Sequence, residues 1–428
     1  MKYYSTNNRE FAVSLQDAVL TGLAPDHGLF MPAQIPIVDG ETLRELKHLS
    51  FQDLAFRLAS PYLDAELTSV QIEDLVQSAF SFPVPLREIE PGLFVLELFH
   101  GPTLAFKDFG ARFLARLVAH FRKESDRQLT VLVATSGDTG SAVAQGFSGI
   151  PGIRVVLLYP KGMVSVIQEQ QLTTAGHNVS ALEVEGTFDD CQRLVKIAFA
   201  DRALRQQIDI TSANSINIGR LLPQSFYYFA AAAQLAGNAA PQFAVPCGNL
   251  GNLTAGVLAK RMGLDISRFF AATNANDIFV QYLQSGAFLP RQAVGTIANA
   301  MDVGNPNNMP RLLNLYDNDL EAMKADINGA AFSDSQTRAE ITDVFKRTGY
   351  VLDPHTAVGL LAARASRDPD SPTVVLATAH PAKFADTVGA AIGKELELPP
   401  ALNEALKKQK NAAPLRADYF DLQEVLLD

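Results

Sequence analysis

The chain has 428 residues, of which 47% are hydrophobic and 19% charged, as in an ordinary globular protein of two or three domains. The formal net charge is −10 and the basic residues are scattered, which argues against nucleic acid as a partner. Cys191 and Cys247 lack metal-ligand spacing, and neither a signal segment nor a membrane span is evident. We expect a cytoplasmic protein without a structural disulfide framework, a bound metal or a membrane partner.

The first part of the chain predicts a helical segment of its own. A turn-rich loop runs from Gly22 to Pro32, and helix-spaced apolar residues follow over 41–58 and 67–80. Pro83 and Pro85 then interrupt the pattern, because proline cannot continue a helix. We therefore place a domain boundary here and assign residues 1–82 to an N-terminal segment.

From about residue 93, short apolar runs alternate with helical patterns. Continuous apolar runs of this kind are typical of parallel strands covered on both faces. They predict strands at 93–99, 129–134, 154–159, 179–184, 243–245, 268–272 and 373–377. The alternation indicates an α/β sheet or a pair of sheets. We assign residues 83–395 to this α/β region and residues 396–428 to a charged, helical C-terminal tail.

Lys107 is the candidate for covalent chemistry. It lies in the stretch 100–110, which reads HGPTLAFKDFG, between the strand at 93–99 and an amphipathic helix. Apolar neighbours such as Phe106 and Phe109, and the positive end of the helix, favour the neutral amine and lower the pKa of the lysine. Such an amine can form a Schiff base or act as a base. On this stretch alone, a lysine that lies along the helix with its head in water is the alternative.

Two glycine-containing loops follow predicted strands, at the strand ends where parallel sheets bind ligands. Residues 135–141, TSGDTGS, place hydroxyl groups and glycines at a helix N-terminus, which suits a carboxylate or a phosphate. Residues 246–256, PCGNLGNLTAG, allow the backbone to approach a phosphate closely at Gly248 and Gly251. They have neither the P-loop lysine nor the Rossmann glycine spacing, so a small phosphorylated cofactor fits better than a nucleotide.

Two further loops complete the set of candidates. Residues 212–220, SANSINIGR, combine polar side chains with Arg220 and favour an anion site as much as an ordinary polar helix start. Thr378 ends the last strand, while His380 is better explained as a turn or core residue, and Lys383 receives no role. A Schiff-base lysine, a glycine loop for one phosphate and loops for an anionic substrate together describe pyridoxal phosphate chemistry.

These motifs resemble those of the threonine synthase family, pyridoxal-phosphate enzymes of the tryptophan synthase β fold type (fold type II). The similarity spans nearly the whole chain and rests on residues 100–108, 134–140, 213–217, 220–224, 247–251 and 378–383, with 4–6 and 26–30 near the N-terminus. It implies a two-lobed α/β fold with an added helical N-terminal segment.

The resemblance also implies a role for each loop. Lys107 would bind pyridoxal 5'-phosphate as a Schiff base, and Thr378 would face the pyridine nitrogen. The cofactor phosphate would be held by Gly248, Asn249, Leu250, Gly251 and Asn252. The substrate carboxylate would bind at Ser136, Gly137, Asp138 and Thr139, and the substrate phosphate at Asn214, Ser215, Asn217 and Arg220.

Two positions depart from relatives. Many relatives in the wider fold type carry asparagine where Asp138 stands, and an ionised aspartate could not donate to the cofactor's 3-oxygen. Asn252 replaces the aspartate of some threonine synthases, and it adds no charge that would repel a phosphate.

The implied reaction converts O-phospho-L-homoserine and water into L-threonine and phosphate, the last step of threonine biosynthesis. It combines γ-elimination of phosphate with β-addition of water, and Lys107 would move protons at several steps. Two alternatives remain open: a serine/threonine dehydratase of the same fold type, and a noncatalytic relative that binds a phosphorylated ligand. The sequence leaves open whether the protein is a monomer or a homodimer.

Overall fold

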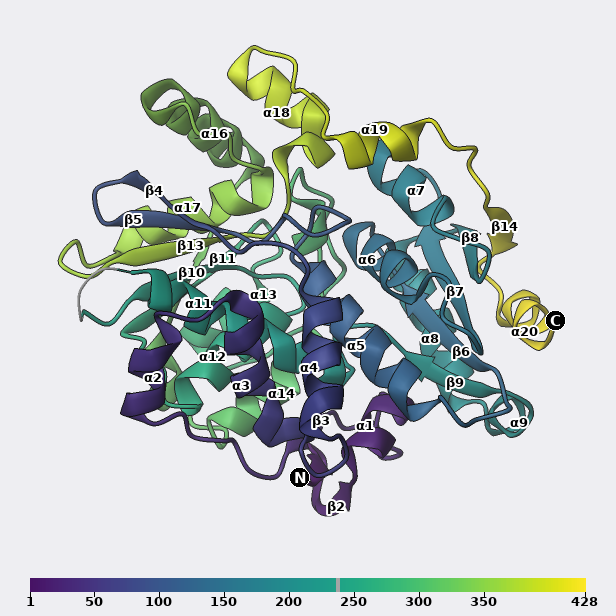
Figure 1. Cartoon of the computed structure of the whole chain (residues 1–428). Helices are drawn as coiled ribbons and strands as arrows, with labels where there is room; N and C mark the ends of the chain where they lie inside the picture. The colour runs from purple at the N-terminus through teal and green to yellow at the C-terminus, as the bar shows by residue number, and fades with distance from the viewer. Residues whose placement is uncertain (236–238) are drawn as a thin grey trace.

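Two mainly parallel sheets in separate lobes organise the chain, as Figure 1 shows. The computed structural model describes residues 1–235 and 239–428. The larger sheet has the strand order β12-β11-β10-β13-β5-β4, with bounds Ile327–Ala331, Arg268–Thr273, Gln242–Pro246, Thr373–Ala377, Leu93–Glu97 and Leu86–Glu90. The smaller sheet has the order β14-β8-β7-β6-β9, with bounds Ala413–Arg416, Val179–Glu185, Ile153–Pro160, Leu129–Ala134 and Asp209–Ser212.

The apolar runs of the sequence are the central strands of these sheets. β6 and β13 have the predicted bounds, and β5, β7, β8, β10 and β11 differ from the prediction by one or two residues at one or both ends. Pairing is parallel throughout both sheets except between β4 and β5, which are antiparallel. The predicted two-lobed α/β fold is therefore confirmed.

Helices cover both faces of each sheet and supply its buried surface. On the larger sheet, α17 (Pro354–Ser366), with α16 (Asp334–Thr348) and α18 (Ala385–Ile392) behind it, packs opposite α11 (Phe226–Gln234), α12 (Gly251–Arg261) and α13 (Ile278–Ser285). On the smaller sheet, α5 (Lys107–Phe121), α6 (Asp138–Phe147) and α7 (Val166–Thr173) pack opposite α8 (Phe188–Ala200) and α9 (Arg202–Gln207). Shorter elements complete the lobes: α10 (Ile218–Leu221), η1 (Leu222–Ser225), η2 (Asn299–Met301), α14 (Met309–Leu315), α15 (Leu320–Asp326) and η3 (Pro381–Phe384).

The N-terminal segment contains more than the predicted helices. β1 (Tyr3–Ser5), β2 (Asn8–Val13) and β3 (Phe30–Pro32) form an antiparallel sheet beside α1 (Leu15–Thr21). The predicted helix over 41–58 is two helices, α2 (Gly40–Leu46) and α3 (Phe51–Leu63), because the Ser50 hydroxyl accepts from Asp53 N and starts a new helix. The predicted helix over 67–80 is α4 (Ser69–Ala79), which Thr68 begins with a capping box.

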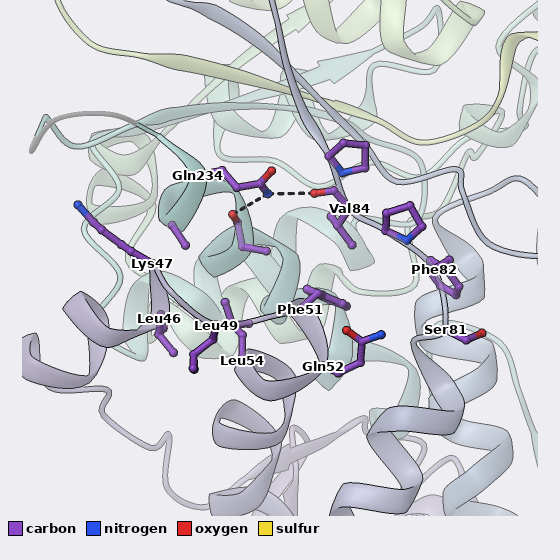
Figure 2. Close-up of a pocket in the computed structure, with 14 residues that line it drawn as sticks. Leu46, Lys47, Leu49, Phe51, Gln52, Leu54, Ser81, Phe82, Val84 and Gln234 are labelled. Carbon is purple, nitrogen blue, oxygen red and sulfur yellow. Dashed lines mark hydrogen bonds between the residues drawn. The ribbon is translucent and has the colours of Figure 1, made fainter.

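The junction between the N-terminal segment and the larger lobe is a shallow hollow, shown in Figure 2. It lies between α2, α3, α11 and the extended residues 81–85, and among the described residues that line it Lys47 is the one charged residue. Gln234 Nε2 donates to Val84 O and to Ala230 O, both at 2.9 Å, which fixes the proline-containing segment against α11. The hollow is a packing seam between two parts of the chain.

A buried arginine joins the N-terminal segment to both lobes. The guanidinium of Arg311, at the start of α14, donates to Phe30 O, Ser215 O and Ile216 O at 2.6–3.2 Å, and to Asn308 Oδ1 at 2.8 Å. Burial lowers the pKa of Arg311 to about 9. Four acceptors therefore satisfy a cation that has no carboxylate partner among them.

The C-terminal tail is part of the smaller lobe. It contains the helices α19 (Pro400–Leu406) and α20 (Tyr419–Leu427), but also β14, which pairs in parallel with β8. The tail predicted to be helical at residues 396–428 thus contains two helices and, in addition, one strand. β14 escapes sequence detection because it is a four-residue edge strand, and three of its residues are exposed.

Within the described residues, no helix combines the length and the apolar character that crossing a membrane requires. Cys191 and Cys247 are both free and buried.

A cluster of aromatic rings packs the N-terminal segment against the lobes. Its contribution to the free energy of unfolding can be measured. Phe80 is fully buried, with ring centroids 5.3–6.4 Å from those of Phe51, Phe109, Phe113 and Phe226. Phe80→Ala should lower the free energy of unfolding by about 3–5 kcal/mol, because it leaves a cavity in this cluster. Phe420→Ala is the matched control, since Phe420 is 72% exposed and its truncation should change stability by no more than about 0.5 kcal/mol. Urea unfolding of both variants measures the difference, and equal losses would contradict the packing.

Candidate active site

The predicted loops meet in one cavity at the carboxyl ends of β6, β9, β10 and β13. Its lining includes the residues predicted from the sequence at Lys107, Ser136, Thr139, Asn214, Ser215, Arg220, Gly248, Asn249, Leu250, Gly251, Asn252 and Thr378. Both sheets contribute, so the cavity lies between the two lobes. This is the position at which open parallel sheets bind their ligands.

Lys107 begins α5 and enters the cavity from a pinned turn. Phe106 N donates to Thr378 O at 2.9 Å, and His380 N donates to Leu104 O at 3.0 Å. Leu104 has φ of +57°, a left-handed conformation that the surrounding contacts must impose. The turn that carries the lysine is thus fixed against the loop that carries Thr378.

The environment of Lys107 favours its neutral form. Burial lowers the pKa of the amine to about 8, against an ordinary value of 10.5. The Asp138 carboxylate raises this pKa, and the cations of Arg220 and Lys383 lower it. The direction is the one that the sequence predicts for this lysine.

The glycine loop between β10 and α12 forms a backbone cradle. Leu250, the residue before α12, is left-handed with φ of +60°, so the chain reverses there and the helix N-terminus opens toward the cavity. At Gly248 an added Cβ would lie 2.8 Å from Ala300 O and 3.1 Å from Met301 Cα. Only glycine allows the segment around Ala300 to close over this loop.

Two buried donors in the cavity have no acceptor within the described residues. Asn252 Oδ1 accepts from Tyr227 Oη at 2.6 Å and Tyr228 Oη at 2.9 Å, so the amide nitrogen Nδ2 is left without a partner. Arg220 Nη1 donates to Ala213 O at 2.7 Å, whereas its Nε has no partner. Burial lowers the pKa of Arg220 to about 10, so the guanidinium stays charged near neutral pH. Unsatisfied donors beside a glycine cradle and a lysine of lowered pKa fit a phosphorylated aldehyde such as pyridoxal phosphate.

Three predicted site residues lie outside the lining of this cavity. Asn217 uses its whole amide internally: Nδ2 donates to Val19 O and Ser212 O, and Oδ1 accepts from Gly219 N. Gly137 precedes α6 with φ of +135°, and an added Cβ would lie 2.6 Å from Gln168 Cδ. Asp138 is turned away from the cavity toward Lys383. These residues shape the loops rather than the cavity wall.

The cavity also contains residues outside the motifs that the sequence singled out: Phe188, Ala300, Met301, Val303 and His355. His355 lies in the first turn of α17, where its Nδ1 is 2.8 Å from Asp353 Oδ1 and its Nε2 accepts from Ala300 N at 3.2 Å. This buried pair holds the 299–303 segment against the glycine loop. The N-cap position of Asp353 could be found from the sequence. The contact between His355 and Ala300 could not, because the two residues lie 55 positions apart in the chain.

Comparisons with known proteins agree with this geometry. The family model described as "Pyridoxal-phosphate dependent enzyme" matches residues 82–379. The models described as "Threonine synthase N terminus" and "Threonine synthase, C-terminal" match residues 2–80 and 356–426. Fold and site together define a pyridoxal-phosphate-dependent enzyme of fold type II.

Full-length relatives identify the family within this class of enzymes. Threonine synthase of Escherichia coli (strain K12) is 41% identical over 100% of both chains, and its crystal structure superposes with a TM-score of 0.95 over 100% of this chain and 99% of the other. Threonine synthase of Haemophilus influenzae is 43% identical over 98% of this chain and 97% of the relative. The structure of PLP-bound threonine synthase from Brucella melitensis has a TM-score of 0.94 at 37% identity, covering 100% and 99% of the two chains. The chain belongs to the threonine synthase family.

The lowered pKa of Lys107 can be measured in the cofactor-free protein. Competitive labelling with trace acetic anhydride across a pH series, read by peptide mass spectrometry, should give Lys107 a midpoint near pH 8. The exposed Lys346 of α16 serves as the reference, because its side chain is open to solvent. A Lys107 midpoint above pH 10 would show that the cavity does not desolvate the amine.

Proposed function

We propose that this protein converts O-phospho-L-homoserine and water into L-threonine and phosphate, with pyridoxal 5'-phosphate as cofactor. One observation carries the proposal: a lysine of lowered pKa, a glycine cradle and a second anion loop line a single cavity in a member of the threonine synthase family. The buried free thiols of Cys191 and Cys247 support the cytoplasmic location that the sequence predicts.

The cofactor would be held at three places in the cavity. Lys107 would carry it covalently, the backbone and side-chain donors of residues 248–252 would bind its phosphate, and the Thr378 hydroxyl would face its ring nitrogen. The unpartnered Asn252 Nδ2 supports the phosphate role, because a phosphate oxygen would satisfy this buried donor. When bound, pyridoxal phosphate supplies an electron sink that makes the α- and β-protons of an amino acid removable.

The protein's own groups would then bind the substrate and move its protons. With a pKa of about 8, the Lys107 amine can accept a proton and return it close to neutral pH. It would remove the α-proton of the substrate and serve the transfers at the neighbouring carbon. The half-buried position of the amine restricts water around it, which protects the intermediate steps from early hydrolysis.

Two loops would recognise the two ends of the substrate. Ser136 and Thr139, at the N-terminus of α6, would bind the substrate carboxylate through hydroxyl and backbone donors. Asn214, Ser215 and Arg220 would bind the substrate phosphate, and the unpartnered Arg220 Nε supports this assignment. We assign Gly137 and Asn217 to shaping these loops, because their surroundings leave them outside the cavity lining.

Product analysis separates this reaction from the alternatives. Incubation of the holoprotein with O-phospho-L-homoserine should release L-threonine and inorganic phosphate in equal amounts. Lys107→Ala should reduce this rate by at least about 1000-fold, because proton transfer and cofactor attachment are both lost. Lys346→Ala, on the exposed face of α16, should retain the full rate. A dehydratase would instead release a 2-oxo acid and ammonia from threonine, and a noncatalytic relative would release no phosphate.

The assignment of Arg220 predicts a specific kinetic defect. Arg220→Met should lower kcat/KM for O-phospho-L-homoserine by about 100-fold, since a charged hydrogen bond to the substrate phosphate is lost. Inhibition by inorganic phosphate should weaken in parallel. Arg338→Met removes an exposed arginine of α16 and should change neither quantity. Unchanged phosphate inhibition in the Arg220 variant would contradict the assignment.

A further inference from the structure

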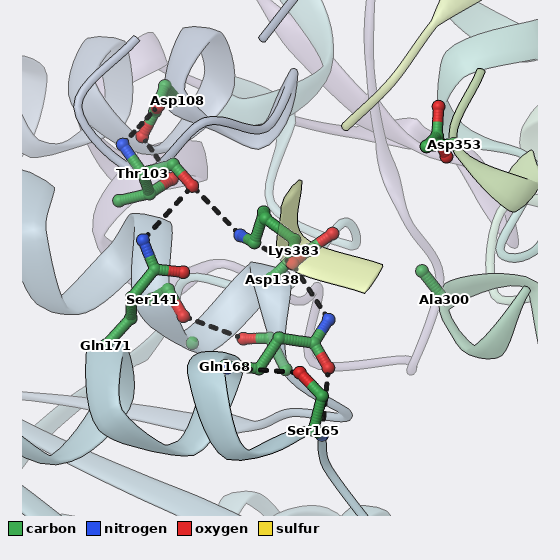
Figure 3. Close-up of polar contacts among 12 residues, drawn as sticks. Thr103, Asp108, Asp138, Ser141, Ser165, Gln168, Gln171, Ala300, Asp353 and Lys383 are labelled. Carbon is green, nitrogen blue, oxygen red and sulfur yellow. Dashed lines mark hydrogen bonds and ion pairs between the residues drawn. The ribbon is translucent and has the colours of Figure 1, made fainter. Parts of the chain in front are cut away.

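Behind the cavity wall lies a buried ion pair that the proposed reaction has not used. Lys383 Nζ is 2.7 Å from Asp138 Oδ1, a contact that Figure 3 shows. The two side chains are 0% and 3% exposed. Asp138 Oδ1 also accepts from Gln168 Nε2 at 2.9 Å. Burial alone would raise the pKa of Asp138, but the ammonium groups of Lys383 and Lys107 together with these hydrogen bonds hold it well below its ordinary value. Asp138 is therefore a carboxylate.

The Lys383 ammonium connects three loops of the active site. Besides Asp138, which begins α6 directly after the loop at Ser136, it donates to Thr103 O at 2.9 Å. Thr103 belongs to the turn before Lys107, and Asp108 fixes that turn by accepting from Thr103 N at 2.9 Å and Thr103 Oγ1 at 2.8 Å. Lys383 itself lies in η3, which follows the Thr378 loop. One cation thus joins the segments that carry the lysine, the carboxylate site and the ring-nitrogen contact.

We propose that Asp138 and Lys383 are a pair of positioning residues, which fix the loop at Ser136 relative to Lys107 and balance the charge that the Lys107 amine experiences. The proposal rests on the proposed function and extends it to residues that do not line the cavity. This role is one that the Asp138 carboxylate can fulfil, because the carboxylate accepts a hydrogen bond from the Lys383 ammonium and need not donate one to the cofactor.

Stability alone does not account for such a pair. Burying two charges carries a desolvation penalty that their attraction often only offsets, so apolar residues of similar size frequently serve stability as well. The Lys383 ammonium donates to both Asp138 and Thr103 and so fixes the positions of the segments that carry them. An apolar pair would fill the same space but would not fix these positions through directed hydrogen bonds.

The charges around Lys107 predict opposite effects for the two partners. Asp138 on α6 raises the pKa of Lys107, whereas Arg220 on α10 and Lys383 on η3 lower it. The Asp108 carboxyl on α5 also experiences the Lys383 charge, but its oxygens accept from Thr103, and His355 on α17 accepts from Ala300 N. Removing one partner therefore leaves the charge of the other uncompensated beside the Lys107 amine.

Four cofactor-free proteins test this proposal: the parent, Asp138→Asn, Lys383→Met and the double variant. Competitive labelling of Lys107 should give a midpoint about one pH unit lower in Asp138→Asn and about one unit higher in Lys383→Met. The double variant should return close to the parent value. Gln168→Leu is the matched control, because it removes a neutral donor to Asp138 and should leave the midpoint unchanged.

A purely structural pair would behave differently. Both single variants would then unfold at lower urea concentration with no displacement of the Lys107 midpoint, and this result, or displacements of the same sign, would overturn the proposal. Asp138→Asn is nearly isosteric, so its midpoint remains decisive even if Lys383→Met does not fold. With O-phospho-L-homoserine, kcat should fall about 10–100-fold in each single variant while KM changes less than threefold. The labelling needs no substrate, so failure of the proposed reaction in the parent protein would be recognised separately.

Discussion

The structure depends on lowering the pKa of one amine at the start of a helix. Lys107 is deprived of water by the packing around it, and this desolvation outweighs the attraction of the nearby Asp138 carboxylate. The turn before the lysine cannot relax away, because it is hydrogen-bonded to the loop after β13 on two sides. A reactive group is thus fixed where the carboxyl ends of two sheets face each other.

Buried cations fix loops from different parts of the chain relative to one another. Arg311 is satisfied by three backbone carbonyls and one amide oxygen, and it fixes the loop at Ser215 to the N-terminal β3 and to α14. Lys383 instead has a carboxylate partner, and it fixes the loop at Ser136 to the turn before Lys107. The first arrangement joins the N-terminal segment to the cavity wall, and the second joins the loop proposed for the substrate carboxylate to the turn that carries Lys107.

Those features that depend on local sequence could be predicted from it. Central strands such as β6 and β13 are continuous apolar runs that the sequence reveals directly. The loops that carry the glycines and hydroxyl groups follow such strands. Because the carboxyl ends of parallel strands lie at the same edge of a sheet, the sequence also predicts that these loops lie close together. Edge strands give no such signal, because β4 exposes charged residues and three of the four residues of β14 are exposed. The contribution of His355, the turned-away carboxylate of Asp138 and the internal bonding of Asn217 depend on partners far away in the chain, which periodicity cannot identify.

Identification of the lysine that holds the cofactor tests the central claim most directly. Lys107 and Lys383 are both enclosed near the same loops, but only Lys107 lines the cavity, and Lys383 is committed to Asp138. The holoprotein would be reduced with sodium borohydride, digested and mapped by mass spectrometry for the pyridoxyl adduct. The account predicts a single adduct on Lys107. An adduct on Lys383 or on any other lysine, with Lys107 unmodified, would contradict it.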